Sequence, residues 1–221
     1  NKDTLFDVSY MAAAYFSMVP YKTLLKILNR LADEELLIPV SKGLFYIQGD
    51  KPFDLDSAIK EYYVDNDCGM FVGYKMYNDL QISDHSDSTI EIYTNKIGAA
   101  HKNIGKYHLT YADLYFDHNA KSIIQTLELI EHGSRIIDID YLQYNSIRQR
   151  GYRRYLDFDI NRVITGIHYQ YSTLVTFHMH LKEAGFSNDF LQTYTGAWYQ
   201  WDVHIFSEKM KQTFLNGADT M

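Results

Sequence analysis

The sequence predicts an α+β protein in two domains, at residues 1–49 and 50–221. An amphipathic helix pattern and a short hairpin pattern precede residue 50, and strand patterns then give way to a mainly helical C-terminal part. The 221 residues are 46% hydrophobic, which is enough for two cores of moderate size. Charged residues of both signs make up 22%, and there are only 12 glycines and 3 prolines, which excludes a disordered chain.

The clearest helix pattern covers residues 20–35. Pro20 occupies the first turn, where its missing N–H costs nothing, and strong helix formers follow. At about 100° per residue, apolar side chains gather on one side of this helix and basic or polar ones on the other. The apolar side holds Leu24, Ile27, Leu28 and Leu31, and the opposite side holds Lys22, Lys26, Asn29 and Arg30. We therefore expect one side to pack against a core and the other to form a basic stripe.

A hairpin is predicted at residues 36–47. Its two alternating segments are separated by Ser41, Lys42 and Gly43, and glycine readily adopts the positive φ that such a turn needs. Pro39 cannot donate to a ladder and belongs on an edge strand. An Ala-rich helical stretch at residues 8–15 comes before the main helix. The resulting order of helix, turn, helix and hairpin is typical of a winged helix-turn-helix domain.

In such a domain the second helix enters the major groove of DNA, and the tip of the hairpin reaches phosphate. The candidate DNA-binding residues are Tyr21, Lys22, Lys26, Asn29, Arg30 and Lys42. The lysines and Arg30 suit phosphate and base contacts, Asn29 suits a base edge, and Lys42 lies at the hairpin tip. A basic face opposite a leucine stripe is also what any solvated amphipathic helix shows, and residues 33–35 are acidic. A protein-interaction module with a winged helix that does not bind DNA is therefore the alternative.

Two short motifs and two longer segments carry a resemblance to a known family. The motifs, Leu28-Asn29-Arg30-Leu31 and Gly43-Leu44-Phe45-Tyr46, lie in the stretch of residues 5–47, and the segments are residues 68–80 and 89–96. On these residues the chain resembles the AbiEi family of antitoxins, components of abortive-infection (type IV) toxin–antitoxin systems. The resemblance implies a transcriptional regulator that binds double-stranded operator DNA and represses its own operon. It also implies that the second domain counteracts a nucleotidyltransferase-like toxin, functionally or by direct contact.

The predicted second domain begins after a linker at residues 49–54, where glycine, proline and charges occur together. Helices are predicted at residues 57–63 and 69–80, and strands at 89–95 and 108–116. A helix at 119–133 ends at Gly133, with Ser134 expected to cap the next one. From Arg135 onward the pattern is mainly helical.

The C-terminal part of the chain contains two unusual clusters. Five of the seven arginines fall between Arg148 and Arg162, which favours internal salt bridges over nucleic-acid binding because Asp157 and Asp159 lie among them. The chain also has 20 tyrosines, joined here by Trp198 and Trp201. Amphipathic aromatic side chains are common in interfaces, so a homodimer or partner face is one interpretation and plain aromatic packing is the other.

Catalytic and metal sites are not predicted. An enzyme of the nucleotidyltransferase type would need Ser134, Asp138 and Asp140 to face one another, but three residues are too few to connect a helix start to a returning strand. Residues 157–159 offer a second Asp pair. His178 and His180 are two positions apart on a predicted helix and point about 200° away from each other, so they cannot share one ion. We expect no cofactor and no metal ion.

Net charge and cysteine content bear on the binding partners and the cellular location of the protein. The net charge is −7, with seven basic and fifteen acidic residues at 52–147, so DNA binding would have to come from a local gathering of cations. The lone Cys68 cannot form an internal disulfide and is expected to be a small buried residue. No apolar run approaches the ~20 residues of a membrane span, so we expect no membrane partner. The lone cysteine and the lack of a basic start followed by an apolar stretch predict a cytoplasmic protein. Because the chain begins at Asn1 rather than Met, we expect a short upstream segment to be missing.

Overall fold

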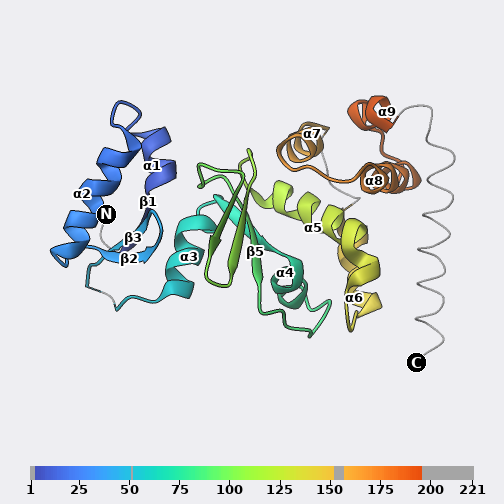
Figure 1. Cartoon of the computed structure of the whole chain (residues 1–221). Coiled ribbons are helices and arrows are strands. Elements are labelled where there is room, and N and C mark those ends of the chain that lie inside the picture. The colour runs from blue at the N-terminus through green and yellow to red at the C-terminus, as the bar shows by residue number, and fades with distance from the viewer. Residues whose placement is uncertain (1–2, 51, 152–156, 196–221) are drawn as a thin grey trace. The chain divides into compact units, whose positions relative to one another are not determined.

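The computed structural model describes residues 3–50, 52–151 and 157–195 (Figure 1). It has the mixed α+β composition that the sequence predicts. The chain divides into two compact units. Unit 1 comprises residues 1–71 and 89–115, and unit 2 comprises residues 72–88 and 116–221.

Unit 1 begins with a three-stranded antiparallel sheet and two helices. Its elements are β1 (Thr4–Asp7), α1 (Val8–Ala14), α2 (Tyr21–Asp33), β2 (Ile38–Ser41) and β3 (Leu44–Ile47). The strand order is β1-β3-β2, so Pro39 lies on an edge strand, as predicted. Gly43 has a φ of 71° in the β2–β3 turn, which confirms the predicted hairpin. Both predicted helices are confirmed, whereas β1 was missed because its only partner, β3, lies some forty residues further along the chain.

The rest of unit 1 is a helix and a second sheet. The elements are α3 (Leu55–Tyr63), β4 (Gly69–Val72), β5 (Ile90–Thr94), β6 (His101–Ile104) and β7 (Tyr107–Tyr111). The strand order is β4-β5-β7-β6; β5 and β7 are parallel, and β6 and β7 form an antiparallel hairpin. The predicted α3 and β5 are confirmed. The predicted strand at 108–116 ends at Tyr111, and β6 was not predicted because its sequence, HKNI, has only one strongly apolar residue.

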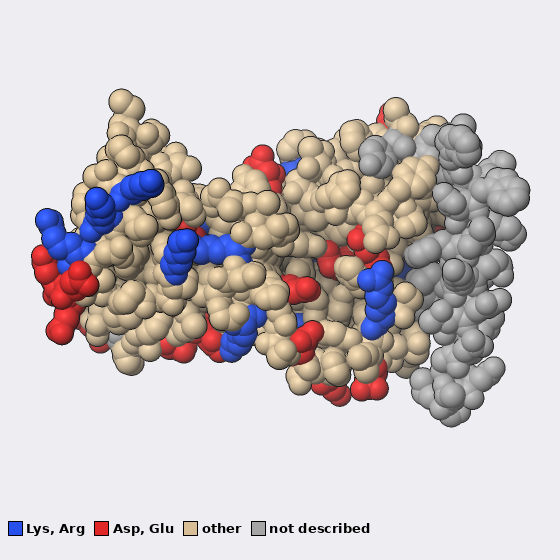
Figure 2. Space-filling view, in the orientation of Figure 1, with Lys and Arg blue, Asp and Glu red and all other residues tan. Residues whose placement is uncertain are grey.

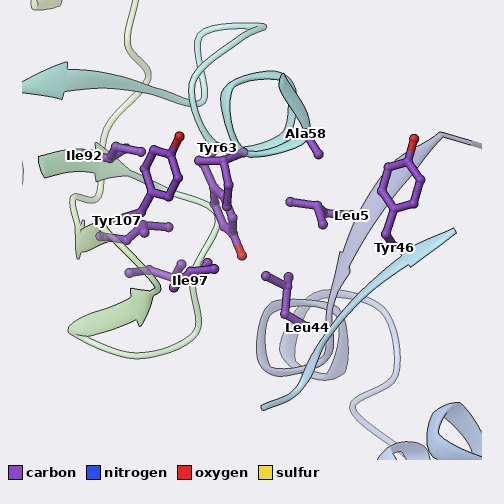
Figure 3. Packing of buried hydrophobic residues seen from close by; sticks show 11 residues of the cluster. Leu5, Leu44, Tyr46, Ala58, Tyr63, Ile92, Ile97 and Tyr107 are labelled. Atoms are coloured by element: carbon purple, nitrogen blue, oxygen red, sulfur yellow. The ribbon is translucent and has the colours of Figure 1, made fainter. Parts of the chain in front are cut away.

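One hydrophobic core connects the two sheets of unit 1. In Figure 3, Tyr63 of α3 lies between Leu5 and Leu44 on one side and Ile92 and Tyr107 on the other. Tyr63, Leu44 and Ile92 are fully buried. The core therefore continues across the predicted linker at residues 49–54, and unit 1 joins chain from both predicted domains. A division of function at residue 50 stays a prediction.

Unit 2 is mainly helical. Its helices are α4 (Gly73–Asp79), α5 (His118–His132), α6 (Tyr141–Gly151), α7 (Asp157–Gly166), α8 (Tyr171–Glu183) and α9 (Asp189–Thr195), with a 3-10 turn, η1 (Gly133–Arg135), after α5. Helix α5 packs against α6, α7 and α8 and has most of its apolar side chains buried. Asp117 is its N-cap and accepts a hydrogen bond from the N–H of Ala120, and the helix ends before Gly133, as predicted.

Two predictions for unit 2 and its border were wrong. The helix predicted at residues 69–80 is confirmed for α4 only; the preceding residues form strand β4, and Gly73, with a φ of 60°, marks the change. Ser134 does not cap α6 but lies within η1, and Asp140 provides the cap by accepting from the N–H groups of Leu142 and Gln143. The predicted C-terminal helix end at Gly217 lies outside the described residues.

The length and hydropathy of the helices in the described residues decide whether any of them could cross a membrane. None of them combines the length and the hydropathy that crossing a bilayer requires.

Candidate nucleic-acid interface

Helix α2 is built so that one face packs and the other is exposed. Leu24 and Leu28 are buried in a cluster with Val8, Leu37 and Phe45, which come from α1 and the hairpin region. Pro20 precedes the helix, and its carbonyl accepts the first backbone hydrogen bonds. The core under α2 thus fixes the direction in which its other face points. Ile27 departs from the predicted apolar side, because it lies at the margin of the leucine stripe and is 42% exposed.

The exposed face of α2 carries the predicted basic stripe. Its polar and basic side chains are exposed, and they are Lys22, Lys26, Asn29 and Arg30. Figure 2 shows blue Lys and Arg side chains in a row over α2, with red acidic side chains at the end of the row. Successive cations lie four residues apart, which is about 6 Å along a helix. The structure therefore brings this part of the predicted site together on one surface.

The hairpin turn lies beside the first turn of α2. The Tyr21 hydroxyl lies 3.0 Å from the position that a Cβ atom on Gly43 would take. The Gly43 carbonyl accepts a hydrogen bond of 2.9 Å from the N–H of Val8, which ties the hairpin turn to the start of α1. Lys42 is exposed on this turn, and Tyr21 is 44% exposed. The structure thus groups Tyr21, Lys22 and Lys42 at one end of the surface, with Arg30 toward the other.

The charges of this surface are mostly uncompensated. Within the described parts of the chain, Lys22, Lys26 and Lys42 have no carboxylate oxygen within 4 Å. Arg30 forms an ion pair of 3.7 Å with Glu34 on the same helix, and both side chains are more than half exposed. Such exposed pairs stabilise a protein by only about 0–1 kcal/mol, so a phosphate can replace Glu34 at little cost.

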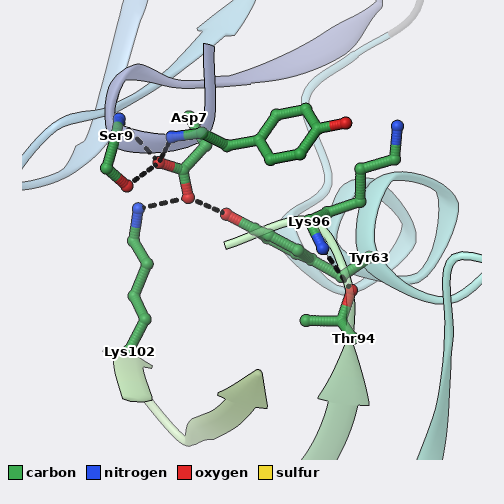
Figure 4. A network of polar contacts seen from close by, with 7 residues as sticks. Asp7, Ser9, Tyr63, Thr94, Lys96 and Lys102 are labelled. Carbon is green, nitrogen blue, oxygen red and sulfur yellow. Dashed lines mark hydrogen bonds and ion pairs between the residues drawn. The ribbon is translucent and has the colours of Figure 1, made fainter. Parts of the chain in front are cut away.

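A buried polar network holds α1, the neighbour of α2, in place (Figure 4). Asp7 is fully buried, and one of its carboxylate oxygens accepts from the N–H groups of Ser9 and Tyr10 at the start of α1. The other oxygen accepts from the Tyr63 hydroxyl at 2.8 Å and from Lys102 Nζ at 2.6 Å. Burial and the nearby Asp7 carboxylate raise the pKa of Tyr63 well above its ordinary value, so its hydroxyl keeps the proton that it donates.

Sequence reasoning missed this network. The Asp-x-Ser pattern at residues 7–9 is a recognisable helix N-cap signal and could have identified the local half. Nothing in the sequence indicates Lys102 as the partner of Asp7, because ninety-five positions separate them. The network matters for the candidate interface because it fixes α1, against which α2 packs.

Arg162, a described member of the arginine cluster of unit 2, forms ion pairs within the fold. Arg162 donates to Asp117 at 2.8 Å and to Asp159 at 3.0 Å, and Asn119 also donates to Asp159. Burial alone would raise the pKa of Asp117, but the Ala120 N–H and Arg162 outweigh burial and lower it. The predicted internal salt bridges are confirmed for Arg162. Residues 152–156 of the cluster, and the predicted aromatic face at Trp198 and Trp201, lie outside the described residues.

Two of the side chains considered for catalysis, those of Asp140 and Asp157, form hydrogen bonds within the fold. Asp140 caps α6, and Asp157 accepts a hydrogen bond of 2.9 Å from Asn188. His178 is buried in α8, where burial lowers its pKa, with a smaller contribution from Lys182. Cys68 is half-buried rather than buried, because it lies in the loop before β4, and its thiol donates to the Asn66 carbonyl. Among the described residues, no three His, Cys, Asp or Glu side chains are grouped as metal ligands.

Comparison with known proteins gives no relative from which a function can be transferred, since neither a family model nor a curated protein matches the chain. The exposed face of α2 and the adjoining hairpin turn therefore have to be interpreted from their own geometry.

Proposed function

We propose that the protein is a DNA-binding transcriptional regulator of the AbiEi antitoxin type. The observation that carries this proposal is the exposed face of α2, where three cations stand opposite a buried leucine stripe and beside the hairpin turn that carries Lys42. A helix so arranged fits the major groove with its outer face toward DNA. We refer to Tyr21, Lys22, Lys26, Asn29, Arg30 and Lys42 as the α2 surface.

The order of elements supports a winged helix. Strand β1, helices α1 and α2, and the hairpin β2–β3 follow one another, and β3 pairs with both β1 and β2. In a winged helix the second helix reads the groove and the hairpin forms the wing. Here α2 takes the place of the recognition helix, and the turn with Lys42, beside the first turn of α2, takes the place of the wing tip.

Each residue type on the α2 surface has a role that its chemistry allows. The lysines neutralise phosphates, which supplies affinity without sequence preference. Arg30 can bind a guanine edge through two parallel hydrogen bonds, and Asn29 can do the same with adenine. Because residues 33–35 at the end of α2 are acidic and exposed, contacts concentrate toward the N-terminal turns. The Tyr21 hydroxyl suits a phosphate contact near the wing.

The antitoxin part of the proposal rests on the resemblance of residues 5–47, 68–80 and 89–96. In this proposal the regulator represses its own operon and counteracts a nucleotidyltransferase-like toxin without being an enzyme itself. The structural tasks of Asp140 and Asp157 support a non-enzymatic function, because both carboxylates are engaged in hydrogen bonds within the fold.

The proposal is tested by fluorescence anisotropy with a labelled duplex from the upstream region of the gene. We expect tight binding by the natural chain and a loss of at least tenfold when Lys22, Lys26 and Arg30 are all replaced by Ala. Lys60→Ala is the matched control, because Lys60 is an exposed helical lysine on α3, outside the α2 surface. Absent binding, or equal losses in the two variants, would favour a winged helix that serves only as a protein-interaction module.

A further inference from the structure

An open cavity of about 560 Å³ lies between α1 and the loop that connects β5 to β6, entirely within unit 1. Helix α1 contributes one tyrosine and two alanines, and the loop contributes mainly small residues. The lining residues are Tyr10, Ala13, Ala14, Asn95, Ile97, Gly98, Ala99, Ala100 and Tyr111. Asp, Glu, Lys and Arg are missing from these described lining residues, so the cavity presents an uncharged surface in a chain of net charge −7.

The walls of the cavity are held by contacts within unit 1. A Cβ atom on Gly98 would lie 2.9 Å from the Ser9 carbonyl oxygen, so the loop runs directly against the start of α1. The Asn95 side chain donates to the Leu114 carbonyl at 3.0 Å, which fixes the other end of the loop. Lys96 Nζ lies 5.0 Å from the centre of the Tyr10 ring, a cation–π contact that holds this ring. The recess is therefore bounded by segments that contact one another or neighbouring parts of unit 1.

The turn between α1 and α2 projects next to this cavity. It contains Tyr15, Phe16 and Met18, which are 67%, 38% and 94% exposed. Figure 1 shows the turn standing out beyond the ends of α1 and α2, and Figure 2 shows no charged side chain on it. Backbone hydrogen bonds from Tyr15 and Phe16 to the Met11 carbonyl give the turn a defined shape. A methionine this exposed beside other apolar side chains is typical of an interaction site.

Helix α1 supplies both the projection and the recess. Ala13 and Ala14 line the cavity, and Tyr15 directly after them begins the projecting turn. A two-fold interface requires a surface that is complementary to itself, and an apolar projection beside an apolar recess meets that requirement. Neither the turn nor the described lining of the cavity carries an acidic side chain, so this contact adds no like-charge repulsion between two chains of net charge −7.

We propose that the protein forms a two-fold homodimer in which the α1–α2 turn of each copy occupies the α1–loop cavity of the other. The dimer does not depend on DNA binding. Combined with the proposed function, it places two α2 helices in one complex.

Analytical ultracentrifugation of the full chain tests the dimer. We expect twice the chain mass for the natural protein in the micromolar range. Met18→Lys on the projection and Ala99→Glu in the recess should each give a monomer, because each places a charge in an apolar contact. Leu142→Glu is the control, since Leu142 is 80% exposed but belongs to unit 2. This variant should stay dimeric.

Mixing the two monomeric variants gives the sharpest result. A mixed dimer contains one natural contact and one in which the introduced lysine meets the introduced glutamate, so the dimer mass should return. A natural chain that is monomeric throughout this range, a dimer that both variants leave intact, or a mixture without recovery would overturn the proposal. If either variant fails to fold by circular dichroism, Met18→Cys with Ala99→Cys in a Cys68→Ser background replaces it. Oxidation should then yield a covalent dimer, and its absence would overturn the proposal as well.

Discussion

The basic side chains of α2 differ from Lys102 and Arg162 in what surrounds their charges. Lys102 is 15% exposed and contacts the fully buried Asp7, and Arg162 is 18% exposed and contacts two aspartates. Lys22 and Lys26, by contrast, are exposed and have no carboxylate within 4 Å among the described residues. The first group is positioned to hold the fold, and the second is available for a partner.

This difference separates stability from binding. Removing one member of a buried pair leaves an uncompensated charge inside the protein, whereas removing an exposed cation changes mainly the surface potential. Substitutions in the two groups should therefore give opposite patterns, with loss of stability in one and loss of DNA affinity in the other. The following variants test that contrast, beginning with the largest expected effect.

Lys102→Met should lower the free energy of unfolding by about 3 kcal/mol, because Asp7 would remain buried without its cation. The matched control is Lys106→Met. Lys106 also contacts an aspartate, Asp56, at 2.7 Å, but that pair is about half exposed. We expect a change of at most about 1 kcal/mol for the control. Chemical denaturation measures both values. Similar losses of unfolding free energy would show that burial does not make the Asp7–Lys102 pair more stabilising than the exposed pair.

Arg162→Met should destabilise the protein by about 2 kcal/mol, because Asp159 is buried and loses a charged hydrogen-bond donor. Arg135→Met provides the comparison, since Arg135 is exposed in the 3-10 turn after α5. Its unfolding free energy should stay within about 0.5 kcal/mol of the natural value. Equal denaturation midpoints for the two variants would contradict a structural role for Arg162.

The α2 variant with Lys22, Lys26 and Arg30 replaced by Ala should unfold within about 1 kcal/mol of the natural protein, because the three side chains are exposed and alanine is a good helix former. Thermal unfolding by circular dichroism provides the measurement. A large loss of stability would mean that these cations hold the fold, and a loss of DNA binding in the same variant could then not be assigned to the interface.

The unfolding free energy should also change with pH. This change should be smaller than the effects of the substitutions above, and it should arise in unit 2. Burial lowers the pKa of His178 below its ordinary value, followed by the effect of Lys182, while the Leu191 backbone acts in the opposite direction. The unfolded chain thus binds a proton at a higher pH than the folded one does. Stability is therefore complete above about pH 6.5 and falls as the pH drops through the lowered pKa.

His178→Gln should reduce this fall in stability between pH 7 and pH 5, which denaturant titrations at several pH values would show. His180→Gln is a useful comparison because burial and the nearby Arg148 also lower the pKa of His180, although Glu183 opposes them. A His178→Gln variant with an unchanged pH profile would exclude His178 as a source of the dependence.

The local elements were predictable from sequence where a single segment contains the whole signal. Helix α2 has a proline start and a regular leucine stripe, and the β2–β3 hairpin has a glycine turn, so both were predicted close to their observed bounds. Strands β1 and β6 were not, because a four-residue strand is recognised mainly by its partner. Residues 69–80 were misjudged because an apolar run with glycine fits a strand as well as a helix.

The candidate site also has features that were predictable from sequence and features that were not. The exposure of Lys22, Lys26, Asn29 and Arg30 follows from helical periodicity and was predicted. The contact between Tyr21 and the hairpin turn, the Asp7–Lys102 pair and the cavity beside α1 depend on segments far apart in sequence. No local pattern encodes those distances. The sequence could therefore indicate which side chains face outward, but not what supports them.

The salt dependence of DNA binding tests the central claim most directly, because it counts the phosphates that the α2 surface neutralises. For the three lysines of the α2 surface, log Kd should change with log salt concentration with a slope of about 2.7 for the natural chain, and the α2 triple variant, which lacks two of these lysines, should be flatter by about 1.8. Lys60→Ala should keep the natural slope. A natural chain whose binding does not respond to salt, or a triple variant with an unchanged slope, would contradict the assignment of the α2 surface as the DNA contact.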